Sequence, residues 1–173
     1  MRITEIIGSH STLDLSGMEV DYVELEWWEL SKRIQRKRTT AGRDVAMKFM
    51  AESIAMKGGD ILYMDESCAI TVRVLKSPTI VLSPRTMHEM ATVCYEIGNK
   101  HMPLFIDGDD ILLPYEAPMF KWLQSAGYSP KSEDRVLENR LKSNAANHHH
   151  SHEESHRESI FEKVINFASR NSE

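Results

Sequence analysis

The sequence predicts two small domains and a polar tail. We expect an all-β N-terminal domain over residues 1–75, an α+β domain over residues 76–142, and a flexible His-rich tail with a short amphipathic helix over residues 143–173. Three observations lead to this prediction. Short alternating strands fill the first part, strand and helix patterns alternate after "KSP", and hydrophobic residues become scarce after Ser143.

Six strands are expected in the N-terminal domain. In the segment "DVAMKFM", Val45, Met47 and Phe49 recur at every second position, which is the period of a half-buried strand. Gly42 in "TTAGRD" can supply the positive φ of a hairpin loop. The strands are predicted in "ITEII" (3–7), "YVELEW" (22–27), "RIQRKRT" (33–39), "DVAMKFM" (44–50), "DILYM" (60–64) and "CAITVRVL" (68–75).

The second domain begins with a strand and a helix. "TIVLS" (79–83) is predicted as the strand, Ser83 as the N-cap of the helix and Pro84 as its first residue. Gly98 is expected just past the helix end, at C′. The side chains expected to face the core recur at helical spacing; they are Met87, Met90, Ala91, Cys94 and Ile97.

The rest of this domain reads as two strands, a helix and a last strand. "PLFID" (103–107) and "DILLPY" (110–115) are joined by "GD" as a hairpin, "APMFKWLQSAG" (117–127) is a helix, and "EDRVLE" (133–138) is a strand. The order βαββαβ is the split βαβ arrangement of ferredoxin-like domains. Two helices are therefore expected on one face of a four-stranded antiparallel sheet.

Composition narrows the classes of function. The formal net charge of −5 disfavours nucleic acid as a partner, because phosphate binding needs a basic face. Cys68 and Cys94 lack metal-type spacing and are too few for a disulfide framework, which favours a reducing cytoplasm. "MRITEIIGSH" lacks the apolar region of a signal peptide, and no apolar run reaches the roughly 18 residues of a membrane span. A soluble cytoplasmic protein without a membrane partner is expected.

Known catalytic motifs are absent from the sequence. It contains no phosphate loop of the form G-x-x-x-x-G-K-[ST], no H-E-x-x-H and no G-x-S-x-G. We therefore expect that the protein is not an enzyme.

The tail carries the strongest metal-binding signal. Imidazole nitrogen suits Ni, Cu and Zn, and a clustered, flexible set lets several rings reach one ion with weak selectivity. A residual purification tag is the alternative, but three consecutive histidines are too few for one. The histidines are His148, His149, His150, His152 and His156.

A single histidine, His101, follows the first predicted helix of the second domain. From the residues alone, an interaction with the carbonyl groups and dipole at the helix end is the better interpretation, and metal binding is the alternative. His10 and His88 have no partners at ligand spacing and are expected to be surface histidines.

The strand "SKRIQRKRTTAGR" is rich in basic residues and suits either an acidic partner or nucleic acid. Acidic residues surround it in the sequence, so a solvated hairpin is the favoured interpretation. Trp27 and Trp28 are adjacent, which on a strand directs one ring to the core and the other outward.

Four segments together resemble the UreE family of urease accessory metallochaperones, over about residues 3–142. They are "EIGNKH" (96–101), "DYVELEW" (21–27), "GGDIL" (58–62) and the stretch from "LLPYEAP" to "GY" (112–128). The resemblance implies that His101 is a nickel ligand, that Gly98 and Asn99 shape the turn presenting it, and that two protomers share one Ni(II) ion. Some members have further histidines shortly after this motif, whereas this chain has none in "GDDILLPYE" (108–116).

The resemblance also implies a process. It predicts a homodimer that delivers Ni(II) to apo-urease through the accessory GTPase UreG. Zn(II) and Cu(II) compete for the same imidazoles, and Cu(II) generally binds such sites more tightly than Ni(II) does. Two alternatives stay open: a peptide-binding adaptor that uses the N-terminal domain, and a metal-storage protein whose tail buffers divalent ions.

Overall fold

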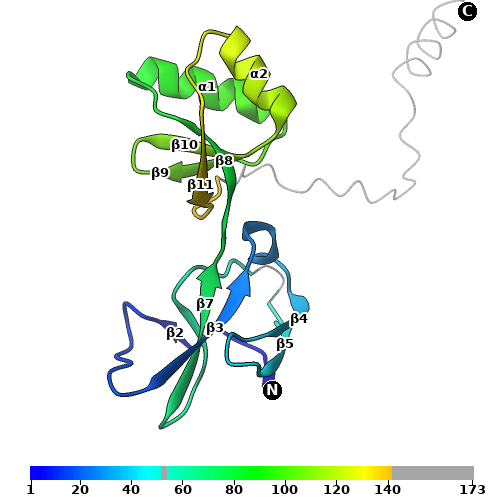
Figure 1. The fold of residues 1–173 in the computed structure, drawn as a ribbon, viewed down its shortest axis with the longest axis vertical. Helices are drawn as coiled ribbons and strands as arrows, with labels where there is room; N and C mark the ends of the chain where they lie inside the picture. Colours follow the sequence, from blue (N-terminus) through cyan, green and yellow to red (C-terminus); the bar gives the residue numbers. More distant parts are fainter. Residues whose placement is uncertain (52–53, 142–173) are drawn as a thin grey trace, which may run out of the picture. The chain divides into compact units, whose positions relative to one another are not determined.

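The computed structural model describes residues 1–51 and 54–141 (Figure 1). The predicted His-rich tail and the amphipathic segment 158–170 lie outside the described residues. The elements are, in chain order, β1 (Arg2–Ile3), β2 (Gly8–Ser9), β3 (Glu19–Leu25), the 3-10 turn η1 (Trp27–Glu29), β4 (Ile34–Arg38), β5 (Asp44–Lys48), β6 (Asp60–Met64), β7 (Cys68–Val74), β8 (Lys76–Leu82), α1 (Met87–Asn99), β9 (Phe105–Asp107), β10 (Asp110–Pro114), α2 (Ala117–Ser125) and β11 (Lys131–Val136).

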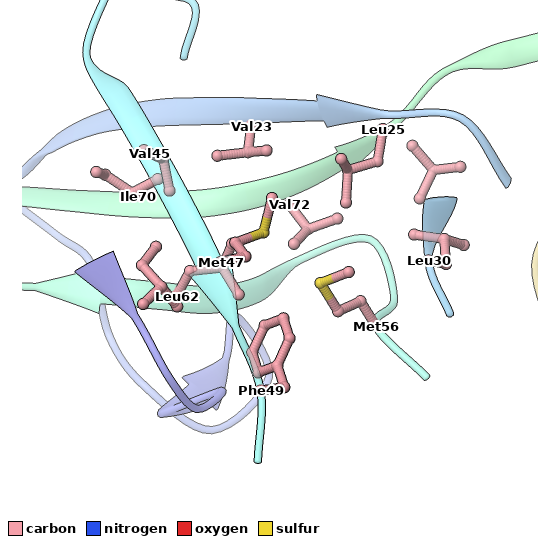
Figure 2. Close-up of a cluster of buried hydrophobic side chains, with 12 residues drawn as sticks. Val23, Leu25, Leu30, Val45, Met47, Phe49, Met56, Leu62, Ile70 and Val72 are labelled. Atoms are coloured by element: carbon pink, nitrogen blue, oxygen red, sulfur yellow. The ribbon is translucent and has the colours of Figure 1, made fainter. Parts of the chain in front are cut away.

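The N-terminal part is rich in strands, as predicted, and forms two sheets. One has the order β2-β6-β7-β3, with β3 parallel to β7, and the other has the order β1-β5-β4. The strands β4 and β5 form the expected hairpin, and Gly42 has a φ of 85° in its loop. Figure 2 shows Val45 and Met47 of β5 among the buried side chains between the sheets, so alternate residues of β5 point outward.

The first predicted strand is wrong in its extent. Only Arg2 and Ile3 pair with β5, and only Gly8 and Ser9 pair with β6. The intervening residues carry the chain from one sheet to the other, so they cannot pair continuously with either. In "ITEII" Ile3 is buried and Ile6 is half-buried, whereas Thr4, Glu5 and Ile7 are exposed, so burial does not alternate along this segment.

A buried carboxylate fixes the β4–β5 loop against β3. Asp21 accepts hydrogen bonds from the amides of Tyr22 and Ala41, at 2.8 and 2.9 Å, and from the Thr40 hydroxyl at 3.0 Å. The guanidinium of Arg43 donates to its other oxygen at 2.9 Å. Burial raises the pKa of this carboxyl, but the hydrogen bonds outweigh burial and lower its pKa from 3.8 to about 2.

The C-terminal part is α+β, as predicted. Its sheet has the order β11-β8-β10-β9 with all pairs antiparallel, and the element order is the expected βαββαβ. Both helices lie on the same side of this sheet in Figure 1. Val93 and Ile97 of α1 and Leu123 of α2 pack there against Ile80 and Ile111 of the strands. Gly108 and Gly127 have positive φ in the two turns where glycine was expected.

The opposite face of this sheet contains a smaller cluster. Val81, Phe105 and Leu112 are buried there, and the ring of Trp27 packs edge-on against Phe105 with a centroid distance of 5.4 Å. The strand prediction for the tryptophan pair is wrong, because both residues belong to the 3-10 turn η1. The two rings nevertheless differ in burial, as predicted: Trp27 is half-buried and Trp28 is 47% exposed.

Both cysteines are free thiols; Cys68 is buried and Cys94 half-buried. Burial raises the pKa of the Cys94 thiol. Neither α1 nor α2, the helices of the described part of the chain, has the length and apolar character needed to span a membrane.

Candidate functional site

Helix α1 begins later than the sequence rules predict. Its N-cap is Thr86, whose hydroxyl accepts a hydrogen bond from the amide of Glu89 at 3.1 Å. Ser83, the predicted N-cap, instead donates its hydroxyl to the carboxylate of Asp110 at 2.6 Å, which ties the end of β8 to β10. The segment "SPRT" offers two possible caps, and this contact between strands selects the second.

The helix also ends later than predicted. Gly98 was expected at C′ but lies inside α1, and Lys100 is the C-cap. His101 occupies C′ with a φ of 56°, and its amide donates to the carbonyl of Gly98 at 3.0 Å. Left-handed conformation at C′ is usual for glycine, whereas histidine is one of the few other residue types that adopt it with any frequency. The histidine therefore replaces glycine at the residue that terminates the helix.

This position exposes the imidazole. His101 is exposed, and so are Gly98 and Asn99 in the last turn. A Cβ on Gly98 would meet nothing within 4 Å, so the surface beside the imidazole is open on this side. The end of α1 thus presents one imidazole over a helix C-terminus, where the partial negative charge of the carbonyl groups favours a cation.

Lys100 is directed toward the other helix. Its ammonium lies 4.1 Å from the centre of the Trp122 ring of α2. A cation–π contact of this kind contributes about 0.5–1 kcal/mol at an exposed position. The contact joins the C-cap of α1 to α2.

The face of α1 that turns away from the core differs from the prediction. Met87 and Ala91 were expected in the core, but both are exposed, Met87 by 82%. The buried stripe is centred on Val93 and Ile97, with Met90 and Cys94 at its edge, so it is rotated from the predicted stripe. Met87 is the first residue of α1 and is not part of this stripe.

The exposed face of α1 carries no Asp, Glu, Lys or Arg, which is unusual for a solvated helix. Its aromatic residue, Tyr95, is 70% exposed. The exposed residues of the helix are Met87, His88, Ala91, Thr92, Tyr95, Gly98 and Asn99. An uncharged face with two large apolar side chains therefore runs along α1 to His101.

Of the predicted metal ligands, only His101 lies within the residues that the structure describes. Among residues 1–51 and 54–141 no three His, Cys, Asp or Glu side chains are grouped so that they could hold a metal ion. His10 and His88 are exposed, as expected for surface histidines. His148, His149, His150, His152 and His156 lie outside the described residues.

Two family models match this chain. The N-terminal domain of the UreE urease accessory protein matches residues 3–75, and its C-terminal domain matches residues 77–160. A urease accessory protein UreE of Flavobacterium johnsoniae is 43% identical over 168 residues, which are 97% of this chain and 99% of that protein. The chain belongs to the UreE family.

Other UreE relatives give the same result. A urease accessory protein UreE of Actinobacillus pleuropneumoniae is 46% identical over 149 residues, covering 84% of this chain and 80% of that protein. One of Acetivibrio thermocellus is 37% identical over 151 residues, covering 87% of this chain and 98% of that protein. The resemblance first seen in "EIGNKH" is thus confirmed over most of the chain. UreE is an accessory protein family and not a catalytic subunit of urease.

One of the segments that carry the resemblance to UreE has a structural role which the sequence did not reveal. "DYVELEW" contains Asp21, whose carboxylate organises the β4–β5 loop. The alternation of "YVELEW" identifies a strand but cannot show which loop meets the aspartate. The sequence signal that could have pointed to this role is a charged residue, Asp21, directly before a predicted strand that is followed by a basic hairpin.

Proposed function

We propose that this protein is a homodimeric nickel metallochaperone of urease maturation, acting in the cytoplasm. Two His101 side chains, one from each protomer, hold one Ni(II) ion, and the tail histidines complete or replace the coordination shell. The nickel is the protein's cargo. It passes through the accessory GTPase UreG to the apo-urease complex. Membership of a family named for urease accessory proteins supports the process.

The observation that carries the proposal is the placement of His101. A histidine in left-handed conformation at the end of α1 is costly compared with glycine, by about 1–2 kcal/mol for an ordinary L-residue. Such local strain at an exposed residue is typical of a functional position. Imidazole is also a ligand that suits nickel. The strained backbone presents the ring outward, where a second protomer can reach it.

The uncharged face of α1 is the proposed contact between protomers. Met87 and Tyr95 supply apolar area, and Gly98 and Ala91 are small enough for two helices to approach closely. Burying an exposed aromatic or long apolar side chain contributes about 1.5–3 kcal/mol. The absence of full charges on this face of the described helix avoids the cost of desolvating them. Both His101 rings would then lie near the two-fold axis.

The proposed coordination explains how the ion is passed on. Two imidazoles fill only part of a nickel coordination shell, so tail imidazoles or water must supply the remaining ligands. These ligands can be exchanged one at a time for those of an acceptor protein. Selectivity against Cu(II) and Zn(II) would come from geometry and from the receiving partner, since affinity alone favours copper.

The decisive experiment is equilibrium dialysis with Ni(II) on three full-length proteins. They are the wild type, His101→Asn, and a variant in which His148, His149, His150, His152 and His156 are all glutamine. Asparagine tolerates left-handed conformation, so His101→Asn removes the ligand with little change to the turn. We expect His101→Asn to lose the tightest site while sedimentation still shows a dimer, and the tail variant to keep that site but bind fewer ions.

The same data separate delivery from storage. Under the storage hypothesis most nickel is held by the tail, so the tail variant would lose nearly all binding and His101→Asn would lose little. Wild-type affinity in His101→Asn would contradict the shared site between protomers. Urease activation in a mixture with the other accessory proteins then tests delivery: His101→Asn should activate poorly even when nickel is bound to the tail.

A further inference from the structure

The three-stranded sheet β1-β5-β4 has a second face that is not part of the core. Ile3 and Met47 are register partners and are both buried, so their neighbours Arg2 and Ala46, also register partners, lie on the opposite side. We call this side the outer face. It is formed by Arg2, Ile34, Arg36, Arg38, Asp44, Ala46, Lys48 and Met50.

The structure distinguishes two groups of basic residues in this hairpin. Lys37 and Arg43 are half-buried and pair with acidic groups, Lys37 with Glu29 and Arg43 with Asp21. In contrast, three basic side chains of the outer face, Arg2, Arg36 and Lys48, have no ion-pair partner in residues 1–51 or 54–141. The carboxylate that the register places on this face, Asp44, pairs with Arg38, so the outer face remains basic in a chain whose net charge is −5.

Two of these basic residues flank one small side chain. Ala46 is the register partner of Arg36 on β4 and of Arg2 on β1. Neighbouring strands are about 4.8 Å apart, so the two arginine backbones are roughly 10 Å apart with only a methyl group between them. Two like charges across a sheet are unfavourable by themselves. A carboxylate above Ala46 could accept hydrogen bonds from both guanidinium groups.

Apolar side chains lie one row further along the strands. Ile34 is opposite Lys48 and is 70% exposed, and Met50, two residues beyond Lys48, is 73% exposed. Single exposed apolar residues are common on protein surfaces, but here two lie together beside a basic row. Positions two apart on a strand are separated by about 7 Å, which is also the distance between same-side residues of an extended peptide.

We propose that the outer face binds an extended acidic segment of a partner protein. One Asp or Glu of that segment lies over Ala46 between Arg2 and Arg36, and an apolar side chain two residues away lies over Ile34 and Met50. Charge complementarity selects this occupant, and the apolar row distinguishes it from nucleic acid, whose backbone offers nothing for isoleucine and methionine to contact. The inference is independent of nickel binding.

The test uses a short fluorescein-labelled peptide with blocked ends, in which Glu and Leu alternate on one side and Ser fills the other. Binding to the full-length protein is measured by fluorescence anisotropy. Matched peptides carry Gln for Glu or Ser for Leu, and a single-stranded oligonucleotide with the same label serves as the nucleic-acid probe. We expect the Glu–Leu peptide to bind at least about tenfold more tightly than either matched peptide, because each lacks one of the two contacts.

Ala46→Glu is the decisive protein variant. Its carboxylate would occupy the space between the two arginines, so we expect peptide binding to fall by tenfold or more while the core-facing residues stay unchanged. Arg36→Gln should weaken binding about fivefold or more, because one of two charge-assisted contacts is lost. Lys131→Gln on β11 removes the same charge elsewhere and should have no effect; far-UV circular dichroism confirms that each variant is folded.

Several results would overturn the proposal. For the peptides, they are equal affinity for the Glu–Leu peptide and its Gln counterpart, and no peptide binding at millimolar concentration. For the protein variants, they are unchanged peptide affinity in Ala46→Glu, and a loss of peptide affinity in Lys131→Gln as large as that in Arg36→Gln. Tighter binding of the oligonucleotide than of the peptide would assign the basic row to phosphate and would equally reject an acidic protein segment as the occupant.

Discussion

Replacing His101 with glycine should stabilise the fold and abolish the tightest nickel site at the same time. The φ of 56° costs an L-residue about 1–2 kcal/mol, and histidine is near the lower end of that range. Glycine removes this cost but loses more conformational freedom on folding, which offsets about 0.5–1 kcal/mol. With a cost near 1 kcal/mol for histidine, the net gain should be at most about 0.5 kcal/mol. For a chain of this length it corresponds to a rise in melting temperature of at most about 2 °C.

The assay is thermal unfolding in the presence of a chelator, at one protein concentration, because bound metal and dimerisation both shift the apparent stability. Nickel affinity is measured separately by equilibrium dialysis. His101→Ala is the matched control, since it removes the imidazole but keeps the Cβ. We expect His101→Ala to be no more stable than the wild type and His101→Gly to exceed both. Equal stability of the glycine and alanine variants would refute backbone strain at this residue, and a tight nickel site surviving in either would refute its role as a ligand.

Three further predictions follow from the geometry and from the proposed function. Asp21→Asn should lower the free energy of unfolding by at most about 2 kcal/mol at neutral pH. The pKa of this carboxyl is lowered from 3.8 to about 2, so its contribution is present above pH 3.8 and is lost as pH falls toward 2; urea unfolding of the variant should therefore depend less on pH between 4 and 2, and identical pH profiles would contradict the buried network. Tyr95→Glu combined with Met87→Glu should shift the protein from dimer to monomer in sedimentation velocity, and an intact dimer would place the interface elsewhere than on α1. Nickel affinity measured by titration should fall steeply between pH 7.5 and 5.0, because imidazole side chains must be neutral to bind metal and ordinarily titrate near pH 6.5; equal affinity at both values would contradict imidazole ligation.

The fold was predictable from the sequence where local signals agree with tertiary packing. Glycine, proline and alternating apolar residues identified the βαββαβ order, and Gly42 takes the positive φ expected in its hairpin loop. The sequence did not separate β1 from β2, because isoleucines occur on both sides of Thr4 and Glu5, where the chain moves from one sheet to the other. A strand pattern records which side chains are buried but not which strand accepts the hydrogen bonds.

The candidate site was predictable in identity but not in geometry. The motif around His101 identified the histidine, whereas the rule that glycine ends a helix favoured Gly98 for the left-handed residue. The helix instead runs through Gly98 to Asn99 and closes with a tighter turn, in which the amide of Lys100 donates to the carbonyl of Ile97. Likewise, helical periodicity placed Met87 and Ala91 in the core, although the buried stripe of α1 is centred on Val93 and Ile97. Helical periodicity gives the spacing of residues on one face of a helix, but it does not give the direction in which the sheet lies.

The pairing of β3 with β7 has a consequence for how the chain folds. Glu19 is the register partner of Cys68, 49 residues later, and β7 is the neighbour of β3 within the sheet. During synthesis β3 must therefore wait, unpaired, until β7 has left the ribosome, and loop closure over this distance slows the step. The pairings of the first two sheets are complete once Val74 has emerged, and β8 starts a new sheet that is closed by β11. The order of the strands thus sets an order of assembly, in which the N-terminal sheets can form before the last strand that pairs with β8 has been made.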